Sequence, residues 1–171
     1  EEQPRGTRGI VGVRQPCPCT MIEYWRNPEG TAKKFAGEFL LTGDLGTQDE
    51  DGYFWYVSRE DDVITTAGYR VGPAEVESAV MAHPAVKDCA AVASPDAERG
   101  EVVKAFIVLH EGHAPGAELA REIQDFVKRE TAPYKYPRRI EFIEALPRTT
   151  TGKVRRKDLR DREALVARGQ E

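Results

Sequence analysis

The stretch Val63–Glu77, with the sequence VITTAGYRVGPAEVE, combines a β-hairpin pattern with the start of a helix. β-branched residues lie before and after Gly68, a residue type that tolerates the positive φ angle of a tight turn. Pro73 stands where proline is tolerated, in the first turn of a helix, and the two glutamates that follow suit the positive end of the helix dipole. The stretch therefore predicts a hairpin and then a helix that ends before Pro84.

Downstream of this helix the apolar residues alternate between strand and helix patterns. Val86–Ala93 and Val102–Leu109 are nearly continuous apolar runs, which is typical of strands covered on both faces. Apolar residues at helical spacing predict a helix over Ala117–Glu130. Arg139–Ala145 alternates as a strand does, and Arg155–Arg168 reads as a charged helix. The fold class predicted is α+β, with a β-hairpin and a three-stranded sheet flanked by helices.

The part of the chain before the hairpin has a different character. Gly and Pro punctuate it, and short β-rich runs such as Tyr53–Val57 predict hairpins and small antiparallel sheets. The composition changes near Arg59. We therefore expect a β-rich unit over residues 1–58, a link at 59–62 and a separate domain over 63–171.

Length and composition limit the class of protein. The chain has 171 residues, of which 40% are hydrophobic and 32% charged, as in soluble globular proteins. No apolar run approaches the roughly 18 residues of a membrane span. Glu1 and Glu2 stand where a signal peptide needs positive charge, so the expected compartment is the cytoplasm.

The three cysteines, Cys17, Cys19 and Cys89, cannot all pair within one chain, so a disulfide framework is not expected. A zinc site at Cys17 and Cys19 would lack further ligands at suitable spacing. No metal site is therefore predicted in this chain.

The net charge of -4 conceals an uneven distribution. Residues 38–62 hold eight acids and one Arg, whereas residues 134–171 hold eleven Lys or Arg and six acids. A basic end is compatible with nucleic acid, with a phosphate-bearing small molecule or with a solvated helix face. The candidates for nucleic-acid contacts are Arg138, Arg139, Arg148, Lys153, Arg155, Arg156 and Lys157. Few aromatic residues accompany them, which disfavours base stacking.

Three segments in sequence order carry a resemblance to a known family. They are Thr42-Gly43-Asp44, the run Ser58–Glu77 and the run Leu146–Lys157, LPRTTTGKVRRK. In this order and spacing they resemble the end of the acyl-adenylate-forming enzymes, which include acyl-CoA synthetases, peptide adenylation domains and luciferases. The segments Gly68–Glu77, Arg99–Phe106 and Ala132–Pro137 are most similar to medium-chain acyl-CoA synthetases.

The resemblance implies an enzyme that joins ATP, a carboxylic acid and coenzyme A through an acyl-adenylate, giving acyl-CoA, AMP and pyrophosphate. It also implies that this chain is a C-terminal part, with the phosphate-binding loop, the acyl pocket and the Mg²⁺ ligand in an N-terminal domain that it lacks. The chain alone is then expected to be inactive. A nucleic-acid-binding module and a regulatory domain without catalysis are the alternative hypotheses.

Two residues of the first unit are candidates for nucleotide binding. A carboxylate such as that of Asp44 can accept two hydrogen bonds, as the two hydroxyls of a ribose require, and the resemblance gives it this role. Taken alone, the spacing favours an Asp44 that caps a turn. By resemblance Arg59 contacts the ribose or phosphate, and its alternative is a surface ion pair with Glu60 or Asp62.

Asp61 corresponds to the family's hinge position, where a change in one residue's dihedral angles swings the small domain between two orientations. Without the resemblance, Asp61 and Asp62 would read as a solvated acidic turn.

The residues that the resemblance assigns to coenzyme A lie in three segments. The hairpin would approach the pantetheine and a phosphate, and two further cations would meet the nucleotide end of the coenzyme. These residues are Ala67, Gly68, Tyr69, Arg70, Arg99 and Lys128. Taken singly, each cation reads as an ordinary surface charge.

Lys153 matches the family's catalytic lysine. The loop Leu146–Gly152 is expected to be flexible, and a mobile ammonium suits stabilisation of charge when a carboxylate attacks the α-phosphate of ATP. It is not a phosphate-binding P-loop, because Pro147 and Val154 stand where that motif needs Gly and Ser or Thr.

Overall fold

The structure is a computed structural model that describes residues 2–169, so the outermost residues of the two expected domains, Glu1, Gln170 and Glu171, lie outside the described part. The chain divides into two compact units, Glu1–Asp61 and Asp62–Glu171. A short 3-10 helix, η1 (Glu60–Asp62), contains the boundary.

The first unit is a four-stranded antiparallel sheet, as its β-rich sequence predicts. Strand β3 (Phe39–Gln48) is central and pairs with each of the others, β1 (Gly9–Arg14), β2 (Phe35–Ala36) and β4 (Phe54–Arg59). Helix α1 (Pro28–Ala32) begins after a cap in which the Asn27 side chain accepts from the Gly30 amide at 2.8 Å.

The second unit opens with the predicted hairpin, β5 (Ile64–Thr66) and β6 (Tyr69–Val71). Ala67 and Gly68 form its two-residue turn with φ angles of 47° and 83°. Two positive φ angles are the mark of a type I′ turn, whose twist suits two paired strands. Ala67 adopts this conformation without the freedom of a glycine.

The sheet of the second unit has five strands, not the three that the sequence predicts. Strand β8 (Gly100–Leu109) pairs antiparallel with β7 (Val86–Asp96) and parallel with β9 (Arg139–Phe142). The hairpin joins the same sheet, because Thr66 is in register with Gly100 at the start of β8. The α+β class is confirmed, with a larger sheet.

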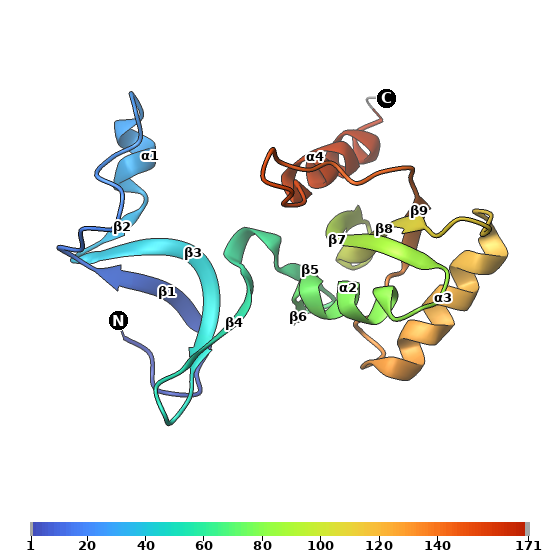
Figure 1. Cartoon of the computed structure of the whole chain (residues 1–171), viewed down its shortest axis with the longest axis horizontal. Coiled ribbons are helices and arrows are strands. Elements are labelled where there is room, and N and C mark those ends of the chain that lie inside the picture. The colour runs from blue at the N-terminus through green and yellow to red at the C-terminus, as the bar shows by residue number, and fades with distance from the viewer. Residues whose placement is uncertain (1, 170–171) are drawn as a thin grey trace. The chain divides into compact units, whose positions relative to one another are not determined.

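Helices cover both faces of this sheet (Figure 1). On one face α2 (Pro73–Met81) and α3 (Ala117–Glu130) bury their apolar residues against alternate residues of β7 and β8. On the other face Leu159 of α4 (Arg156–Ala167) packs with Phe106, the largest fully buried side chain. The double cover explains the continuous apolar runs of β7 and β8.

Candidate functional site

Asp44 and Arg59 lie opposite one another on β3 and β4. The Arg59 Nη1 atom is 3.2 Å from Asp44 Oδ1 and donates to the Thr42 carbonyl at 3.2 Å. The Thr42 hydroxyl in turn accepts from the Asp44 amide at 3.0 Å. The two residues predicted to bind nucleotide are therefore brought together, and each side chain remains partly exposed.

Gly43 makes this pairing sterically accessible. Its φ angle is 80°, and an added Cβ would lie 3.0 Å from the Arg59 Nη2 atom. Partial burial opposes the charged form of Arg59, but the carboxylates of Asp44 and Asp61 outweigh it, so the pKa of Arg59 is raised. The guanidinium is thus a fixed cation beside a carboxylate that accepts hydrogen bonds.

The two carboxylates of the link differ in their partners. Asp61 Oδ1 lies 3.5 Å from Arg59 Nε. Asp62 is nearly buried and pairs with Arg160 and, at 3.6 Å, with Arg156. The expected alternative pairing of Arg59 with Glu60 or Asp62 is therefore replaced by pairing with Asp44 and Asp61.

The hairpin residues expected to meet coenzyme A form one surface with the β7–β8 turn. The register of Thr66 with Gly100 sets the hairpin turn beside the segment that carries Arg99. The Tyr69 ring stacks on the Tyr134 ring, with centroids 4.3 Å apart and planes at 12°. Ala67, Gly68, Arg70 and Arg99 are all exposed there.

Lys128 lies in the last turn of α3, where a cation complements the negative end of the helix. Its Nζ donates to Asp125 at 2.8 Å, a bond that raises the pKa of Lys128, and lies 4.5 Å from the centre of the Tyr136 ring. The Arg138 guanidinium lies 5.2 Å from the same ring. The motifs predict no role for the Tyr136 ring, although Tyr134–Arg138 interleaves Tyr with Lys and Arg.

Lys153 follows a hydrogen-bonded turn within the loop that the sequence suggests is flexible. The Thr149 amide donates to the Lys153 carbonyl at 2.8 Å, and the Lys153 amide donates to the Thr149 hydroxyl at 3.1 Å. Gly152 provides the positive φ angle, 86°, that this turn requires. Arg148 ties the turn to the sheet through Asp88. Among residues 2–169 no ion pair of the Lys153 ammonium is found, and its side chain is exposed.

The Lys153 turn and the hairpin lie at opposite ends of β7. Arg148 binds Asp88 near the start of this strand, whereas Asp96, at its end, pairs with Gly100 beside the hairpin. Eight residues of extended chain separate the two aspartates by about 26 Å. The second unit thus presents two separate candidate surfaces.

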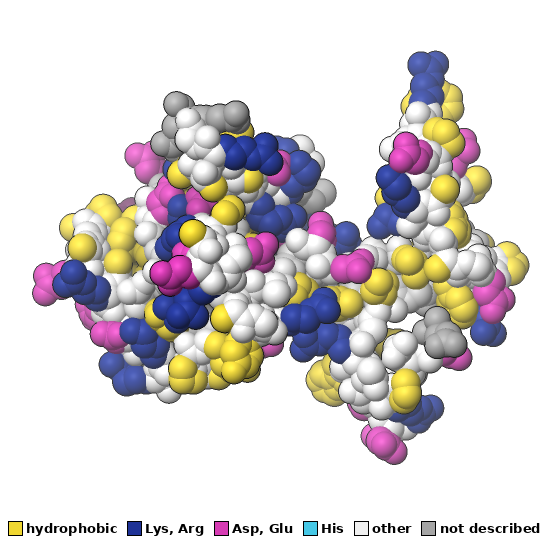
Figure 2. Space-filling model, turned by 180° about the vertical axis from the view of Figure 1, so that it is seen from behind, with side chains coloured by type: hydrophobic (Ala, Val, Ile, Leu, Met, Phe, Trp, Pro, Cys, Tyr) yellow, Lys and Arg dark blue, Asp and Glu magenta, His cyan; other side chains and the backbone are white. Residues whose placement is uncertain are grey.

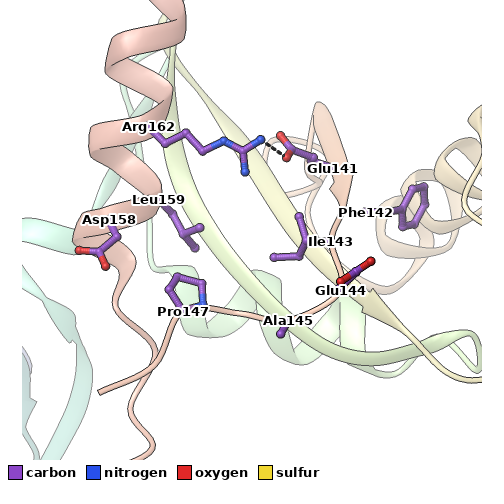
Figure 3. A pocket seen from close by; sticks show the side chains of 9 residues that line it. All are labelled: Glu141, Phe142, Ile143, Glu144, Ala145, Pro147, Asp158, Leu159 and Arg162. Atoms are coloured by element: carbon purple, nitrogen blue, oxygen red, sulfur yellow. Dashed lines mark hydrogen bonds and ion pairs between the residues drawn. The ribbon is translucent and has the colours of Figure 1, made fainter. Parts of the chain in front are cut away.

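A shallow groove between the end of β9 and α4 holds none of the predicted site residues (Figure 3). Arg162 and Glu141 face one another across it with a 2.6 Å hydrogen bond. Within the described residues no cluster of three His, Cys, Asp or Glu side chains could hold a metal ion. None of the described helices is long and apolar enough to cross a membrane.

The basic residues proposed for nucleic acid are largely engaged within the protein. Arg148, Arg155 and Arg156 pair with Asp88, Asp158 and Glu77. On the face in Figure 2, Lys and Arg side chains are interspersed with Asp and Glu. Among the described residues on this face, no continuous basic stripe of the kind that tracks a phosphate backbone is seen.

Comparison with a family model decides the relationship. Residues 75–153 match the model of the AMP-binding enzyme C-terminal domain. They belong to this family. The match contains most of α2, strands β7 and β8 and Lys153, and it confirms the resemblance for this part of the chain.

Curated relatives extend the similarity over nearly the whole chain. The mitochondrial acyl-coenzyme A synthetase ACSM4 of Homo sapiens is 52% identical over 94% of this chain and 28% of its own length. An uncharacterized acyl-CoA ligase of Bacillus subtilis, YtcI, is 49% identical over 92% of this chain and 30% of its own length. The chain therefore spans less than a third of these relatives.

Solved structures of related enzymes have a fold similar to that of this chain. The anthranilate CoA ligase AuaEII in complex with anthranoyl-AMP is 42% identical, with a TM-score of 0.84 over 96% of this chain and 32% of that chain. The ATP-bound chimera RpMatB-BxBclM B1 is 40% identical, with a TM-score of 0.86 over 95% of this chain and 32% of that one.

Proposed function

We propose that the chain is the mobile C-terminal part of an acyl-CoA synthetase that converts ATP, a carboxylic acid and coenzyme A to acyl-CoA, AMP and pyrophosphate. The observation that carries the proposal is the separation of two cationic surfaces at opposite ends of β7, one around Lys153 and one around the hairpin. A two-step reaction can use each surface in turn. The identity of about 50% to acyl-CoA synthetases supports this reading.

In the adenylation step, the Lys153 ammonium stabilises the charge that develops as a substrate carboxylate attacks the α-phosphate of ATP. Asp44 accepts hydrogen bonds from the ribose hydroxyls, and Arg59 fixes the Asp44 carboxylate while contributing positive charge near the phosphate. Their mutual 3.2 Å contact supports a shared role. Mg²⁺ would neutralise phosphate charge, and we assign its ligands to the part of the enzyme outside this chain.

In the thioester step, the hairpin approaches the pantetheine, with Gly68 leaving room for close passage of the ligand: an added Cβ would meet nothing within 4 Å. Arg70, Arg99 and Lys128 supply the cations for the phosphates of coenzyme A. Arg99, which would meet the nucleotide end of the coenzyme, favours free coenzyme A over a carrier-protein pantetheine as the acceptor. Asp61 carries the rotation between the two steps.

The test of the whole proposal is a pair of assays on the full-length enzyme that contains this chain. We expect ATP–pyrophosphate exchange that requires a carboxylic acid, and AMP release that requires coenzyme A. The 171-residue chain alone should show no exchange. Exchange by this chain, freed of host synthetase, would overturn the assignment of the acid and phosphate sites to the remainder of the enzyme.

Arg99→Ala should weaken coenzyme A use selectively. Loss of one charge-assisted hydrogen bond costs about 1.5 to 3 kcal/mol, so the KM for coenzyme A should rise at least tenfold. Acid-dependent exchange should stay unchanged, because Arg99 does not serve adenylation. Arg121→Ala, on the exposed side of α3, is the matched control and should change neither value. An unchanged KM for Arg99→Ala contradicts the role.

A further inference from the structure

Strand β7 lies at an edge of the sheet, and two carboxylates cover its outward-facing amides. The Cys89 amide donates to Asp88 Oδ1 at 3.0 Å, and the Ala91 amide donates to Glu77 Oε1 at 2.9 Å. An edge strand leaves such amides without a partner strand, so both carboxylates satisfy backbone groups that pairing does not.

Each of these carboxylates also binds one of the two arginines that flank the Lys153 turn. Arg148, before the turn, binds Asp88 and donates to the Gly152 carbonyl at 2.6 Å. Arg156, after the turn, forms a two-pronged contact with Glu77, with Nε to Oε1 at 3.0 Å and Nη2 to Oε2 at 2.8 Å. Glu77 is almost fully buried, and Asp62 lies 3.6 Å from the same guanidinium.

We propose that Arg148 and Arg156 are positioning residues that hold the Lys153 turn in a fixed place against the edge of β7. A planar guanidinium bound at two points fixes orientation as well as distance, which a single surface charge does not. Lys153 is three residues from Arg156 and five from Arg148, so both ends of its turn are anchored while its ammonium stays exposed. The role assigned to Lys153 rests on the proposed function, but the anchoring does not.

The test is the backbone order parameter of the Gly152 and Lys153 amides in the 171-residue chain, measured by NMR relaxation. Glu77→Gln keeps an oxygen for the Ala91 amide and removes the charge that Arg156 binds. Combined with Arg148→Gln, it should lower these order parameters from rigid values of about 0.85 to below about 0.6. Arg162→Gln, which breaks an exposed pair with Glu141 farther along α4, should leave them unchanged.

The order parameters of the amides in the central strand β8 distinguish a loosened turn from a general loss of folded structure. If the turn loosens while β8 keeps its order parameters, the anchoring is established whether or not the enzyme proves to be a synthetase. If the turn stays rigid in the double variant, or if β8 loosens equally, the proposal is overturned. In the full-length enzyme the same variant should slow adenylation and leave conversion of supplied acyl-adenylate unchanged.

A second, independent observation concerns Cys17 and Cys19 of the first unit. Their Sγ atoms lie 3.1 Å apart in a turn where the Thr20 amide and hydroxyl donate to the Cys17 carbonyl at 3.2 and 2.8 Å. Cys19 is exposed and Cys17 partly so. The hydrogen bond from Cys19 lowers the pKa of the Cys17 thiol, which favours the reactive thiolate.

We propose that Cys17 and Cys19 are a dithiol modification site that closes to a disulfide on reaction with a low-molecular-weight disulfide. The Cys17 thiolate attacks one sulfur of the reagent, forms a mixed disulfide and releases one thiolate, which takes up a proton. Cys19 then loses its proton, and its thiolate attacks the Cys17 sulfur and expels the second reagent thiolate, which takes up a proton. The protein loses two electrons and two protons, and one reagent disulfide becomes two thiols.

The probe is oxidised glutathione, applied to the reduced 171-residue chain. We expect the free thiol count to fall from three to one, with a mass lower by two hydrogens and no glutathione adduct. Cys89 is the internal control, because burial raises the pKa of its thiol and keeps it inert. Cys19→Ser should instead retain glutathione on Cys17. A stable adduct on the unmodified sequence, or no reaction, overturns the proposal.

Discussion

Lys153→Ala in the full-length enzyme should slow adenylation by about 10²- to 10³-fold, the usual loss when a preorganised charge is removed from a transition state. The Lys153 side chain is exposed, and within residues 2–169 its ammonium has no ion pair that its loss would break. Stability should therefore change little. The measurement is acid-dependent ATP–pyrophosphate exchange.

The second half-reaction provides the discriminating measurement for this variant. The Lys153 turn is anchored near Asp88, about 26 Å along β7 from the hairpin. Conversion of a supplied acyl-adenylate to the thioester should therefore keep its normal rate. Lys157→Ala is the matched control, since Lys157 is exposed and pairs with Asp161 at 2.5 Å. Equal loss in both half-reactions would show that the Lys153 surface and the hairpin surface do not each serve a separate half-reaction.

Local patterns predict the elements of this fold well. Helix α3 has the bounds that the spacing of its apolar residues predicts, Ala117–Glu130. The hairpin turn also follows from local chemistry, because Gly68 allows the positive φ angle. These features depend on residues within one turn or one pair of strands.

Long-range pairing is what the sequence did not predict. The hairpin joins the main sheet through Thr66 and Gly100, 34 positions apart, and no local pattern encodes that register. Strand β7 continues through Pro95, beyond the end of the apolar run at Ala93, because an edge strand tolerates a residue without an amide proton.

The same limit applies to the candidate site. The motifs identify Asp44, Arg59 and Lys153 as residue types suited to nucleotide chemistry, but the contact between Asp44 and Arg59 depends on strand register. Arg156 and Glu77 lie 79 positions apart. The sequence offers Arg156 as a candidate nucleic-acid contact and Glu77 as a charge suited to the start of a helix, and it does not predict that they pair. Glu77 becomes buried only in the folded chain, and only there does its pair with Arg156 hold the Lys153 turn.

Asp61→Pro should separate the two half-reactions in a way that no other substitution of this residue does. Asp61 lies within the 3-10 helix η1, whose φ angles of about -50° to -70° include the value near -65° that proline imposes. Proline therefore favours the conformation that has η1 and denies the residue the dihedral change that a hinge needs. One half-reaction should fall by at least about 10²-fold, the cost typical of misplaced catalytic groups, while the other survives.

Asp61→Ala is the matched control, because it removes the carboxylate that contacts Arg59 at 3.5 Å but leaves the φ angle free. Both half-reactions should then stay within a few-fold of normal, since an exposed ion pair contributes only about 0 to 1 kcal/mol. If Asp61→Pro and Asp61→Ala behave alike in folded protein, the rotation does not use this residue. The adjacent Asp62 is the less suitable hinge, because its pairing with Arg156 and Arg160 holds its side chain against α4.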